Sequence, residues 1–396
     1  MRIDKRAIRG WLCDMIRIES VNPSLASEGA GERAMAEYVA SACRGLGLEV
    51  RVEEASPGRP NVVAVMRGGA PSRDKNLLFN GHLDTVGLGG MKDPLVPTER
   101  DGRLYGRGAL DMKGGLASIL GAVEALVRSG IRLEGDVIFA ATSDEEYASV
   151  GAAHAARSVD AGGAVVAEAT GLGLCTAHKG FAWLKVRTVG RAAHGSLPAE
   201  GVDAIVKMGK FLSRLERYSE ADLARRSHRL LGPPSVHAST IAGGTELSTY
   251  PAECTVMIER RTIPGETESG VVDEMQRILD EISAEDRQFG AQCGLEVYRP
   301  PYEVDPGERV CRCLSGAFRS VTGRDPHVVG VAAWLDSAVF ASAGIPSVIF
   351  GPGGGGQHAD EEYVNLEDVY TVSRVLAETA VLFSGGVGDL EGAGCP

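Results

Sequence analysis

Short apolar runs that end in polar or acidic residues recur along the first half of this chain of 396 residues. They are rich in Val, Ile, Leu and Phe, as is typical of strands buried on both faces of a parallel sheet. Amphipathic segments with helical spacing of apolar residues lie before and between them. The alternation predicts an α/β domain with a central, mostly parallel sheet and flanking helices. The expected strands are Asn61–Met66, Asn76–Leu83, Asp136–Thr142 and Ala164–Glu168, and the expected helices cover about residues 8–16, 33–46 and 116–127.

The pattern changes after Lys179. Residues 180–302 have the order β-α-β-β-α-β, which predicts a small ferredoxin-like α+β domain with two helices on one face of its sheet. Helix–strand alternation resumes after Pro306. We therefore predict one α/β domain, formed by residues 1–179 and 303–396, that is interrupted by an inserted domain at residues 180–302.

Charge and cysteine usage limit the classes of partner. The chain has 53 acidic and 41 basic residues, a net charge of −12. An acidic surface repels nucleic acid and anionic lipid, so we expect neither as a partner. No run reaches the roughly 18–20 apolar residues of a membrane span. The eight cysteines are scattered, which favours reduced thiols and a cytoplasmic location.

His82 and Asp84 end the first of three polar clusters that follow predicted strands. Side chains two residues apart on an extended chain can face the same way. A histidine that binds a metal commonly needs a carboxylate to fix its tautomer, and Asp84 suits that task. A hydrogen-bonded pair at a strand end remains an alternative.

Five more chemistry-bearing residues stand at comparable places. Asp111 precedes a long predicted helix and could also be an ordinary N-cap. Glu145 and Glu146 follow the strand Asp136–Thr142, and Glu168 ends the strand Ala164–Glu168. His358 follows the strand Pro346–Phe350 through a glycine-rich loop. A phosphate-binding loop is the weaker interpretation of those glycines, because no Lys-Ser/Thr follows at the required spacing.

Together these clusters predict a two-metal site. The expected ligands, which include one shared aspartate, are His82, Asp111, Glu146, Glu168 and His358. Nitrogen and carboxylate ligands without thiolate suit Zn²⁺, with Co²⁺ or Mn²⁺ as alternatives. Two such cations can acidify a water molecule and polarise an amide carbonyl. Glu145 is left free to act as a base.

The clusters resemble, in order and context, the zinc-dependent amidohydrolase and metallopeptidase family of acetylornithine deacetylase, succinyl-diaminopimelate desuccinylase, aminoacylase and bacterial glutamate carboxypeptidase. The resemblance extends from Asn22-Pro23 to Val364-Asn365-Leu366. It implies that the α/β domain is catalytic and that two zinc ions bind in each subunit. The roles it implies are His82 and Glu168 on one metal, Glu146 and His358 on the other, Asp111 as the bridge, Asp84 orienting His82, Glu145 as general base and then acid, and a cis peptide bond after Asp111.

The same resemblance assigns the inserted domain to a lid or dimerisation role, and hence predicts a homodimer. His194 would reach the partner subunit's active site and hold the oxyanion. Arg261 would grip a substrate carboxylate, a bidentate task that suits arginine. Without the resemblance, an exposed loop histidine and a surface arginine would be the simpler interpretations. We also assign Ser248, where many relatives carry Asn, and Gly353 to substrate binding.

The predicted function is hydrolysis of the amide bond of a small N-acyl amino acid. Metallo-carboxypeptidase or dipeptidase activity on short peptides remains an alternative, because the sequence does not say which side of the amide carries the recognised carboxylate. An inactive relative that binds metal or peptide is a third possibility. Such a protein should have lost Glu145 or a ligand, whereas this chain keeps all six positions.

Overall fold

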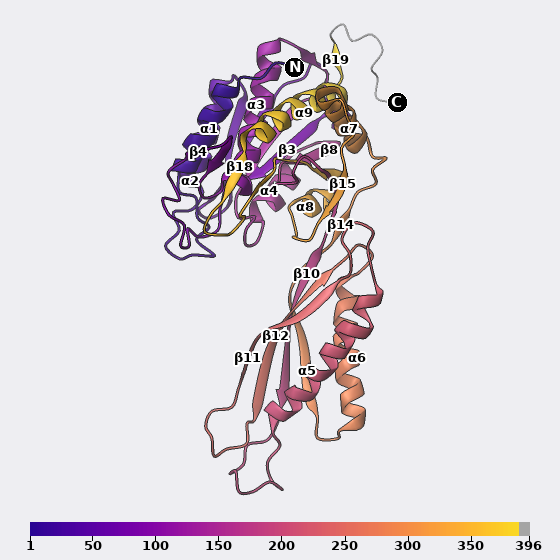
Figure 1. Cartoon of the computed structure of the whole chain (residues 1–396). Coiled ribbons are helices and arrows are strands. Elements are labelled where there is room, and N and C mark those ends of the chain that lie inside the picture. Colours follow the sequence, from indigo (N-terminus) through magenta and orange to yellow (C-terminus); the bar gives the residue numbers. More distant parts are fainter. Residues whose placement is uncertain (388–396) are drawn as a thin grey trace. The chain divides into compact units, whose positions relative to one another are not determined.

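The computed structural model describes residues 1–387, which form two compact units. Unit 1 contains Met1–Thr176, Val304–Val329 and the described residues from Leu335 onward. Unit 2 contains Ala177–Glu303 together with the short segment Gly330–Trp334, which the sequence does not assign to the inserted domain. Figure 1 shows the elements of both units along the chain.

Unit 1 is built on a mixed sheet with the strand order β1-β2-β7-β3-β8-β16-β9. The four strands β7, β3, β8 and β16 are parallel to one another, whereas β1, β2 and β9 pair with their neighbours in antiparallel fashion. The bounds are β1 Glu49–Ser56, β2 Arg59–Met66, β3 Leu77–His82, β7 Val137–Thr142, β8 Gly163–Val166, β9 Leu174–His178 and β16 Ser347–Ile349.

Helices cover this sheet (Figure 1). The longest of them form one packed group, in which α3 contacts both α1 and α9, and α9 contacts α7. A second group contains α4, which contacts β1, β2, β7 and α8. The helices are α1 Lys5–Arg17, α2 Arg33–Gly45, α3 Gly114–Ser129, α4 Val150–Ser158, α7 Arg309–Thr322, α8 Ser337–Ser342 and α9 Leu366–Ser384.

The carboxyl ends of the parallel strands meet at one edge of the sheet. His82, the last residue of β3, pairs with Thr142, the last residue of β7. On the other side of β3, Val166 at the end of β8 pairs with Ile349 at the end of β16. The loops that follow these four strands therefore start side by side, where ligands gather in open α/β sheets.

Short strands complete unit 1. A small antiparallel sheet has the order β17-β18-β5-β4, and β19 pairs with β6. The bounds are β4 Thr98–Arg100, β5 Arg103–Tyr105, β6 Arg132–Leu133, β15 Val328–Val331, β17 Gly354–Gly355, β18 Tyr363–Asn365 and β19 Gly386–Val387, and a helical turn, η2, covers Ala109–Lys113.

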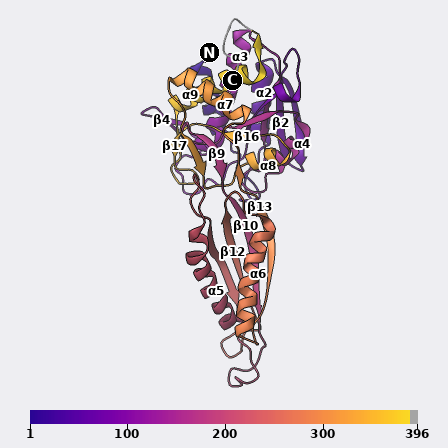
Figure 2. The ribbon, with the colours of Figure 1, turned by 90° about the vertical axis from the view of Figure 1, so that its right-hand side faces the viewer.

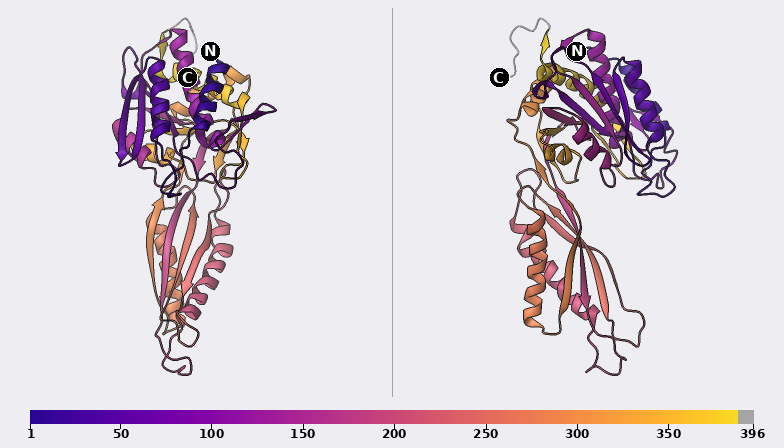
Figure 3. Two further views of the ribbon diagram at one scale, coloured as in Figure 1. Left: turned by 90° about the vertical axis from the view of Figure 1, so that its left-hand side faces the viewer. Right: turned by 180° about the vertical axis from the view of Figure 1, so that it is seen from behind.

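Unit 2 is a four-stranded antiparallel sheet with the order β11-β12-β10-β13 and two helices. Figure 2 places the helices in front of the sheet, and the opposite view on the left of Figure 3 places the sheet in front of the helices, so both helices lie on one face. The buried side chains of β10 and β12 alternate along each strand and form a core with α5 and α6. The bounds are β10 Gly180–Val189, α5 Ala204–Ala221, β11 Ser235–Gly243, β12 Glu253–Thr262, α6 Glu268–Glu285, β13 Gly290–Arg299 and β14 Tyr302–Glu303.

The predicted fold class is confirmed: an α/β sheet with flanking helices and a β-α-β-β-α-β insertion. Several elements of unit 1 were not predicted, among them β1, α4 and the sheet strand β9. Strand β1 is a largely exposed edge strand rich in charged residues, so it lacks an apolar run. Helix α4 is short and rich in alanine, which gives a weak periodic signal. Among residues 1–387, no helix combines the length and the apolar character that crossing a membrane requires.

Candidate metal centre

His82 is the buried last residue of β3, with a side chain only 1% exposed. Its Nδ1 lies 2.9 Å from the backbone oxygen of Asp84 and 3.6 Å from the carboxylate of the same residue. When Nδ1–H donates to that carbonyl, Nε2 keeps its lone pair for a ligand. The backbone of Asp84, more closely than its carboxylate, therefore sets the orientation of the His82 ring.

Asp111 stands between two histidines. Its Oδ1 lies 3.0 Å from Nε2 of His82, and its Oδ2 lies 3.2 Å from Nε2 of His358. Asp111 belongs to η2, and the peptide bond that follows it is cis, as the sequence resemblance implied. One carboxylate thus presents a different oxygen to each imidazole.

Each of the two histidines also has a glutamate beside it. Oε1 of Glu168, just after β8, lies 3.4 Å from Nε2 of His82. Oε2 of Glu146, after β7, lies 3.3 Å from Nε2 of His358. The five side chains predicted as metal ligands therefore converge, although they come from positions 82 to 358 of the chain.

Glu145 lies beside these residues. Its carboxylate and the ligand atoms of His82 and Glu168 lie within 4.8 Å of one another. Asp144, the residue before it, has a left-handed backbone (φ +69°), which turns the chain sharply after β7. The backbone N–H groups of Glu145 and Glu146 then donate to the two carboxylate oxygens of Asp84, each at 3.1 Å.

Both imidazoles are surrounded by negative charge. Burial lowers the pKa of His82, but the carboxylates around it, led by Glu168, outweigh burial and hold this pKa well above its usual value. Hydrogen bonds to Asp111 and Glu146 raise the pKa of His358 to about 10. The site therefore favours positive charge at both imidazole positions.

The glutamates resist ionisation because they are enclosed and crowded. Burial, with a contribution from Asp111, raises the pKa of Glu146 to about 7. Burial also raises the pKa of Glu168, and it holds the pKa of Glu145 well above its usual value. A nearby divalent cation would favour the ionised form of each of these groups.

The donor set fits such cations. His82, Asp111 and Glu146 offer ligand atoms that lie within 4.8 Å of one another, and so do His82, Glu145 and Glu168. The remaining carboxylate oxygen of Glu146 is buried without a hydrogen-bond partner in the described part of the chain. Four carboxylates around two imidazoles leave an excess of negative charge, which is costly to bury unless a cation offsets it.

Glu362 is a site residue that the sequence analysis did not identify. Its carboxylate is buried and accepts hydrogen bonds from the backbone N–H groups of Gly108, Leu110 and Asp111 at 2.9–3.0 Å. It also pairs with Arg107 at 3.0 Å. Glu362 lies in a run of three acidic residues, and nothing in the sequence distinguishes it from its exposed neighbour Glu361.

Asp336 is a second residue near the predicted metal ligands to which the sequence analysis assigns no role. It precedes α8 and is 1% exposed. Burial raises the pKa of Asp336 to about 7, and the neighbouring charges that act on it include His82 and Glu168.

Gly353 is the predicted substrate residue that lies in unit 1. Its backbone N–H donates to Oδ2 of Asp368 at 3.1 Å. A Cβ at this position would stand 2.8 Å from the same oxygen and 3.2 Å from the Cα of Gly171, so a larger residue would make the Asp368 side chain shift. The structure explains this glycine by packing, and its assignment to the substrate stays a prediction.

The other three predicted residues lie in unit 2. His194 is exposed and bonds Ser196 through its Nδ1 at 2.8 Å. The backbone oxygen of Ser248 accepts from Gly195 at 2.7 Å, so the loops of His194 and Ser248 lie together. Arg261, near the far end of β12, pairs with Glu259 and lies over the ring of Phe181. Their roles at a substrate stay predictions.

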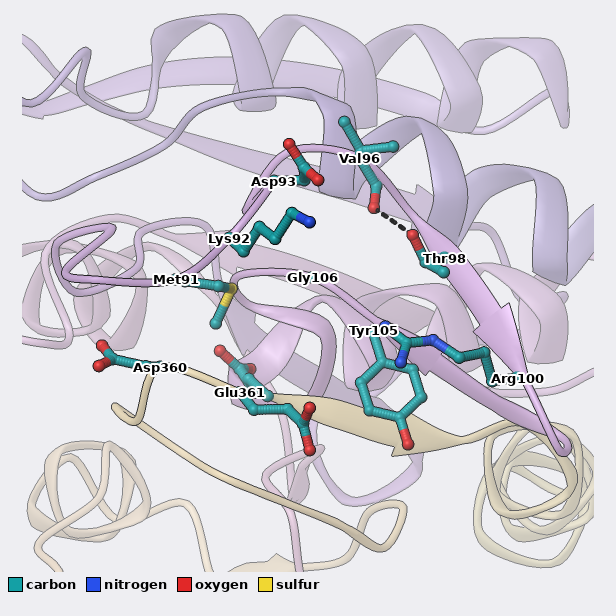
Figure 4. A pocket seen from close by; sticks show the side chains of 11 residues that line it. Met91, Lys92, Asp93, Val96, Thr98, Arg100, Tyr105, Gly106, Asp360 and Glu361 are labelled. Carbon is teal, nitrogen blue, oxygen red and sulfur yellow. Dashed lines mark hydrogen bonds between the residues drawn. The ribbon is translucent and has the colours of Figure 1, made fainter.

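Unit 1 also has a cavity of about 500 Å³ whose lining side chains carry both signs of charge (Figure 4). Lys92 and Arg100 line it on one part of the chain, and Asp360 and Glu361 line it on another. None of the five predicted metal ligands and neither Glu145 nor Asp84 belongs to its lining. The chemistry-bearing cluster is therefore a separate site.

Comparisons with known proteins agree with this geometry. Residues 78–381 match peptidase family M20/M25/M40. Acetylornithine deacetylase from Myxococcus xanthus is 32% identical over 346 residues, which cover 85% of this chain and 87% of the relative.

Two solved structures share the fold. Aminopeptidase PepT from Bacillus cereus superposes with a TM-score of 0.78 at 20% identity, over 96% of this chain and 98% of that one. The YXEP protein of Bacillus subtilis, a dinuclear metal-binding peptidase of the M20 family, superposes with a TM-score of 0.75 at 16% identity, over 96% and 98%.

Proposed function

The chain belongs to peptidase family M20/M25/M40, and from this membership we propose that it is a dizinc deacylase of small N-acylated amino acids. As a member of that family it is a hydrolase of amide or peptide bonds. One observation carries the proposal: the two oxygens of Asp111 face His82 and His358 separately. That arrangement is what a carboxylate shared by two cations requires.

The chain offers one set of donors to each cation. His82, Glu168 and one oxygen of Asp111 would hold the first, and Glu146, His358 and the other oxygen of Asp111 would hold the second. Nitrogen and carboxylate donors suit Zn²⁺, and Co²⁺ or Mn²⁺ could replace it. When bound, such a pair would acidify a water molecule and polarise the amide carbonyl.

Glu145 is the residue that would move the proton. It lies beside His82 and Glu168 without being needed in either donor set. It would take a proton from the attacking water and pass it to the leaving nitrogen. A base works best when its pKa is close to the working pH, and the raised pKa of Glu145 is in the favourable direction.

The acyl substrate is inferred from the relatives. The M. xanthus relative is an acetylornithine deacetylase and is 32% identical, whereas the peptidase structures are 16–20% identical. We therefore favour an N-acyl amino acid over a dipeptide. The alternative of a metallo-carboxypeptidase or dipeptidase is kept because the folds coincide.

The experiment that tests this proposal is a parallel substrate screen. Zinc-loaded protein is assayed with N-acetyl, N-succinyl and N-formyl amino acids and with dipeptides, and Glu145→Gln protein from the same preparation is the control for contaminating enzymes. We expect release of a free amino acid from at least one N-acyl series, with kcat/KM higher than for any dipeptide. Faster cleavage of dipeptides would overturn the deacylase assignment, and no cleavage at all would overturn the hydrolytic role.

A homodimer formed through unit 2 is part of the proposal. His194 pairs with Thr249 before β12 begins, whereas Arg261 is near its end. The nine residues from Glu253 to Arg261 are separated by eight steps of about 3.3 Å each, so they span roughly 26 Å along the strand. His194 and Arg261 of one chain are therefore too far apart to hold the same small substrate.

The free edge of the unit 2 sheet supports the same arrangement. Strand β11 is the edge strand, and nearly all of its residues are exposed. Two large apolar side chains on this side of the unit, Ile205 of α5 and Ile241 of β11, are 44% and 55% exposed. A second copy of the chain would cover this surface and supply a second His194.

A further inference from the structure

We propose that Asn22 and Arg59 are positioning residues of the metal centre, acting through the carboxylate of Asp84. This inference rests on the proposed function, since it concerns the same cluster of ligands. Neither residue would touch a cation or a substrate. Their effect would be to hold Asp84 in the one orientation that serves His82, Glu145 and Glu146 together.

Asp84 is the point at which three functional residues are tied. Its backbone oxygen lies 2.9 Å from Nδ1 of His82. Its Oδ1 accepts from the backbone of Glu145, and its Oδ2 accepts from the backbone of Glu146, each at 3.1 Å. A rotation of this one carboxylate would release the turn that carries the base and a predicted ligand of the second cation.

Asn22 is a further donor to the Asp84 carboxylate. Its side chain is fully buried, and its Nδ2 donates to Oδ2 of Asp84 at 2.8 Å and to Oδ1 of Asp144 at 3.0 Å. The backbone N–H of Asn22 donates to Thr85 at 2.9 Å, which joins this segment to the chain just after Asp84. The Asn22 amide thus bonds both carboxylates, that of Asp84 and that of Asp144.

Arg59 fixes the orientation of the Asn22 amide. Its Nη2 donates to Oδ1 of Asn22 at 2.9 Å and lies 3.3 Å from Oδ1 of Asp144. Its Nη1 pairs with Glu32, which is fully buried, at 2.5 Å. Because the guanidinium approaches the oxygen of the amide, the Nδ2 group must face Asp84 and Asp144.

A supporting role of this kind has a measurable size. Partners that orient metal ligands commonly change metal affinity or activity by about 10–100-fold when they are mutated. Loss of a buried hydrogen bond elsewhere in the fold would lower the free energy of unfolding but would leave the metal affinity unchanged. The test therefore needs a second buried asparagine that makes comparable bonds away from the centre.

Asn76 provides that matched control. It precedes β3, at the end opposite to His82, and is 6% exposed. Its Nδ2 donates to the backbone oxygen of Asp160, and its Oδ1 accepts from the backbone of Asp136, each at 2.9 Å. Asn22→Leu and Asn76→Leu each remove a buried amide of the same size.

The experiment measures metal binding apart from activity. Wild-type, Asn22→Leu, Asn76→Leu and Arg59→Lys proteins are stripped of metal, their thermal unfolding is compared, and Zn²⁺ affinity is measured by competition with a chromophoric chelator. The visible spectrum of the Co²⁺-loaded forms reports the ligand geometry. At saturating metal, kcat and KM are then compared.

We expect Asn22→Leu to bind Zn²⁺ about 10–100-fold more weakly than Asn76→Leu, with a changed Co²⁺ spectrum and a lower kcat. Arg59→Lys keeps the charge beside Glu32 but lacks the second nitrogen, which bonds Asn22. We therefore expect its Zn²⁺ affinity and kcat to fall as well. Asn76→Leu should lower only the unfolding temperature. Equal Zn²⁺ affinity and equal spectra for the two asparagine variants would overturn the proposal.

The outcomes separate this inference from the proposed function. A wild-type protein that binds metal but cleaves no amide contradicts the proposed function alone, because the affinity comparison still decides the role of Asn22. Normal hydrolysis with unchanged affinity in Asn22→Leu contradicts the positioning role alone. A wild-type protein that binds no metal contradicts both.

Discussion

The carboxylate of Glu362 accepts a hydrogen bond from the backbone N–H of Asp111 at 3.0 Å. The same carboxylate accepts from Gly108 and Leu110, so it holds the whole turn that carries the residue between the two histidines. Glu362 follows His358 by only four residues. The segment that supplies one predicted ligand of the second cation therefore also anchors the shared aspartate.

We expect Glu362→Gln to weaken the binding of both cations, because Asp111 faces both histidines. Replacing one accepting oxygen with an NH₂ group sets donor against donor at this turn, and a loss of about 10–100-fold in metal affinity is expected. Chelator competition measures it. The matched control is Glu361→Gln, the same change at an exposed neighbour, which should leave affinity unchanged; a similar loss in both variants would contradict the anchoring role.

Glu145→Gln should separate binding from turnover. The carboxylate of Glu145 is not required in either donor set, so we expect both cations to be retained. Turnover should fall by about 10²–10⁴-fold or more, since the proton has no acceptor. Elemental analysis and kcat measured on one sample check both halves of this prediction, and near-normal turnover would remove Glu145 from the role of base.

Metal removal should lower stability as well as activity. A cation that binds only the folded chain adds about 2.7 kcal/mol to the free energy of unfolding at 100 times its Kd. We therefore expect chelation to lower the unfolding temperature and abolish turnover, and added Zn²⁺ to restore both. Asp111→Ala should show no metal-dependent shift. A fully active protein without metal would rule out the two-metal mechanism.

His178, the last residue of β9, should make stability depend on pH independently of the metal centre. Its ring is buried, its Nδ1 lies 2.9 Å from the backbone oxygen of Lys179, and burial lowers its pKa to about 4. Between about pH 6.5 and 4 the unfolded chain binds a proton that the folded chain excludes. The free energy of unfolding should therefore fall as pH decreases through this range.

The size of that effect is testable by substitution. Between pH 7 and 5, His178 should account for about 2 kcal/mol of lost stability. Denaturant unfolding of His178→Phe should show a correspondingly weaker decline, while His327→Ala, at an exposed histidine, should decline like the wild type. An unchanged pH dependence in His178→Phe would mean that the His178 ring binds its proton equally well in the folded and the unfolded chain.

The sequence was most informative where chemistry follows regular structure. His82 and Glu168 were predicted as ligands because apolar runs end at them, and the carboxyl ends of β3 and β8 indeed lie next to each other. The β-α-β-β-α-β order of unit 2 was predictable because its strands and helices have clear periodic patterns.

The supporting residues could not be predicted in this way. Asn22 reaches Asp84 across 62 positions, and Glu362 reaches Asp111 across 251. Such pairings depend on how the elements pack. The local sequence around an asparagine or a glutamate does not predict that its side chain will have a buried hydrogen-bond partner. The same holds for Arg59, whose burial beside Glu32 contradicts the exposure usual for a charged side chain.

A shared active site makes the strongest prediction for unit 2. If His194 acts in the partner subunit, His194→Ala and Glu145→Gln should each be nearly inactive, yet a mixed dimer has one site with both residues intact. Random assembly of an equal mixture should then restore about a quarter of wild-type activity, because half of the dimers are mixed and each has one intact site. Mixing His194→Ala with the double variant Glu145→Gln/His194→Ala supplies no intact His194, so it should restore none. If His194 served its own chain, neither mixture would regain activity, and the separation of His194 from Arg261 along β12 would need another explanation.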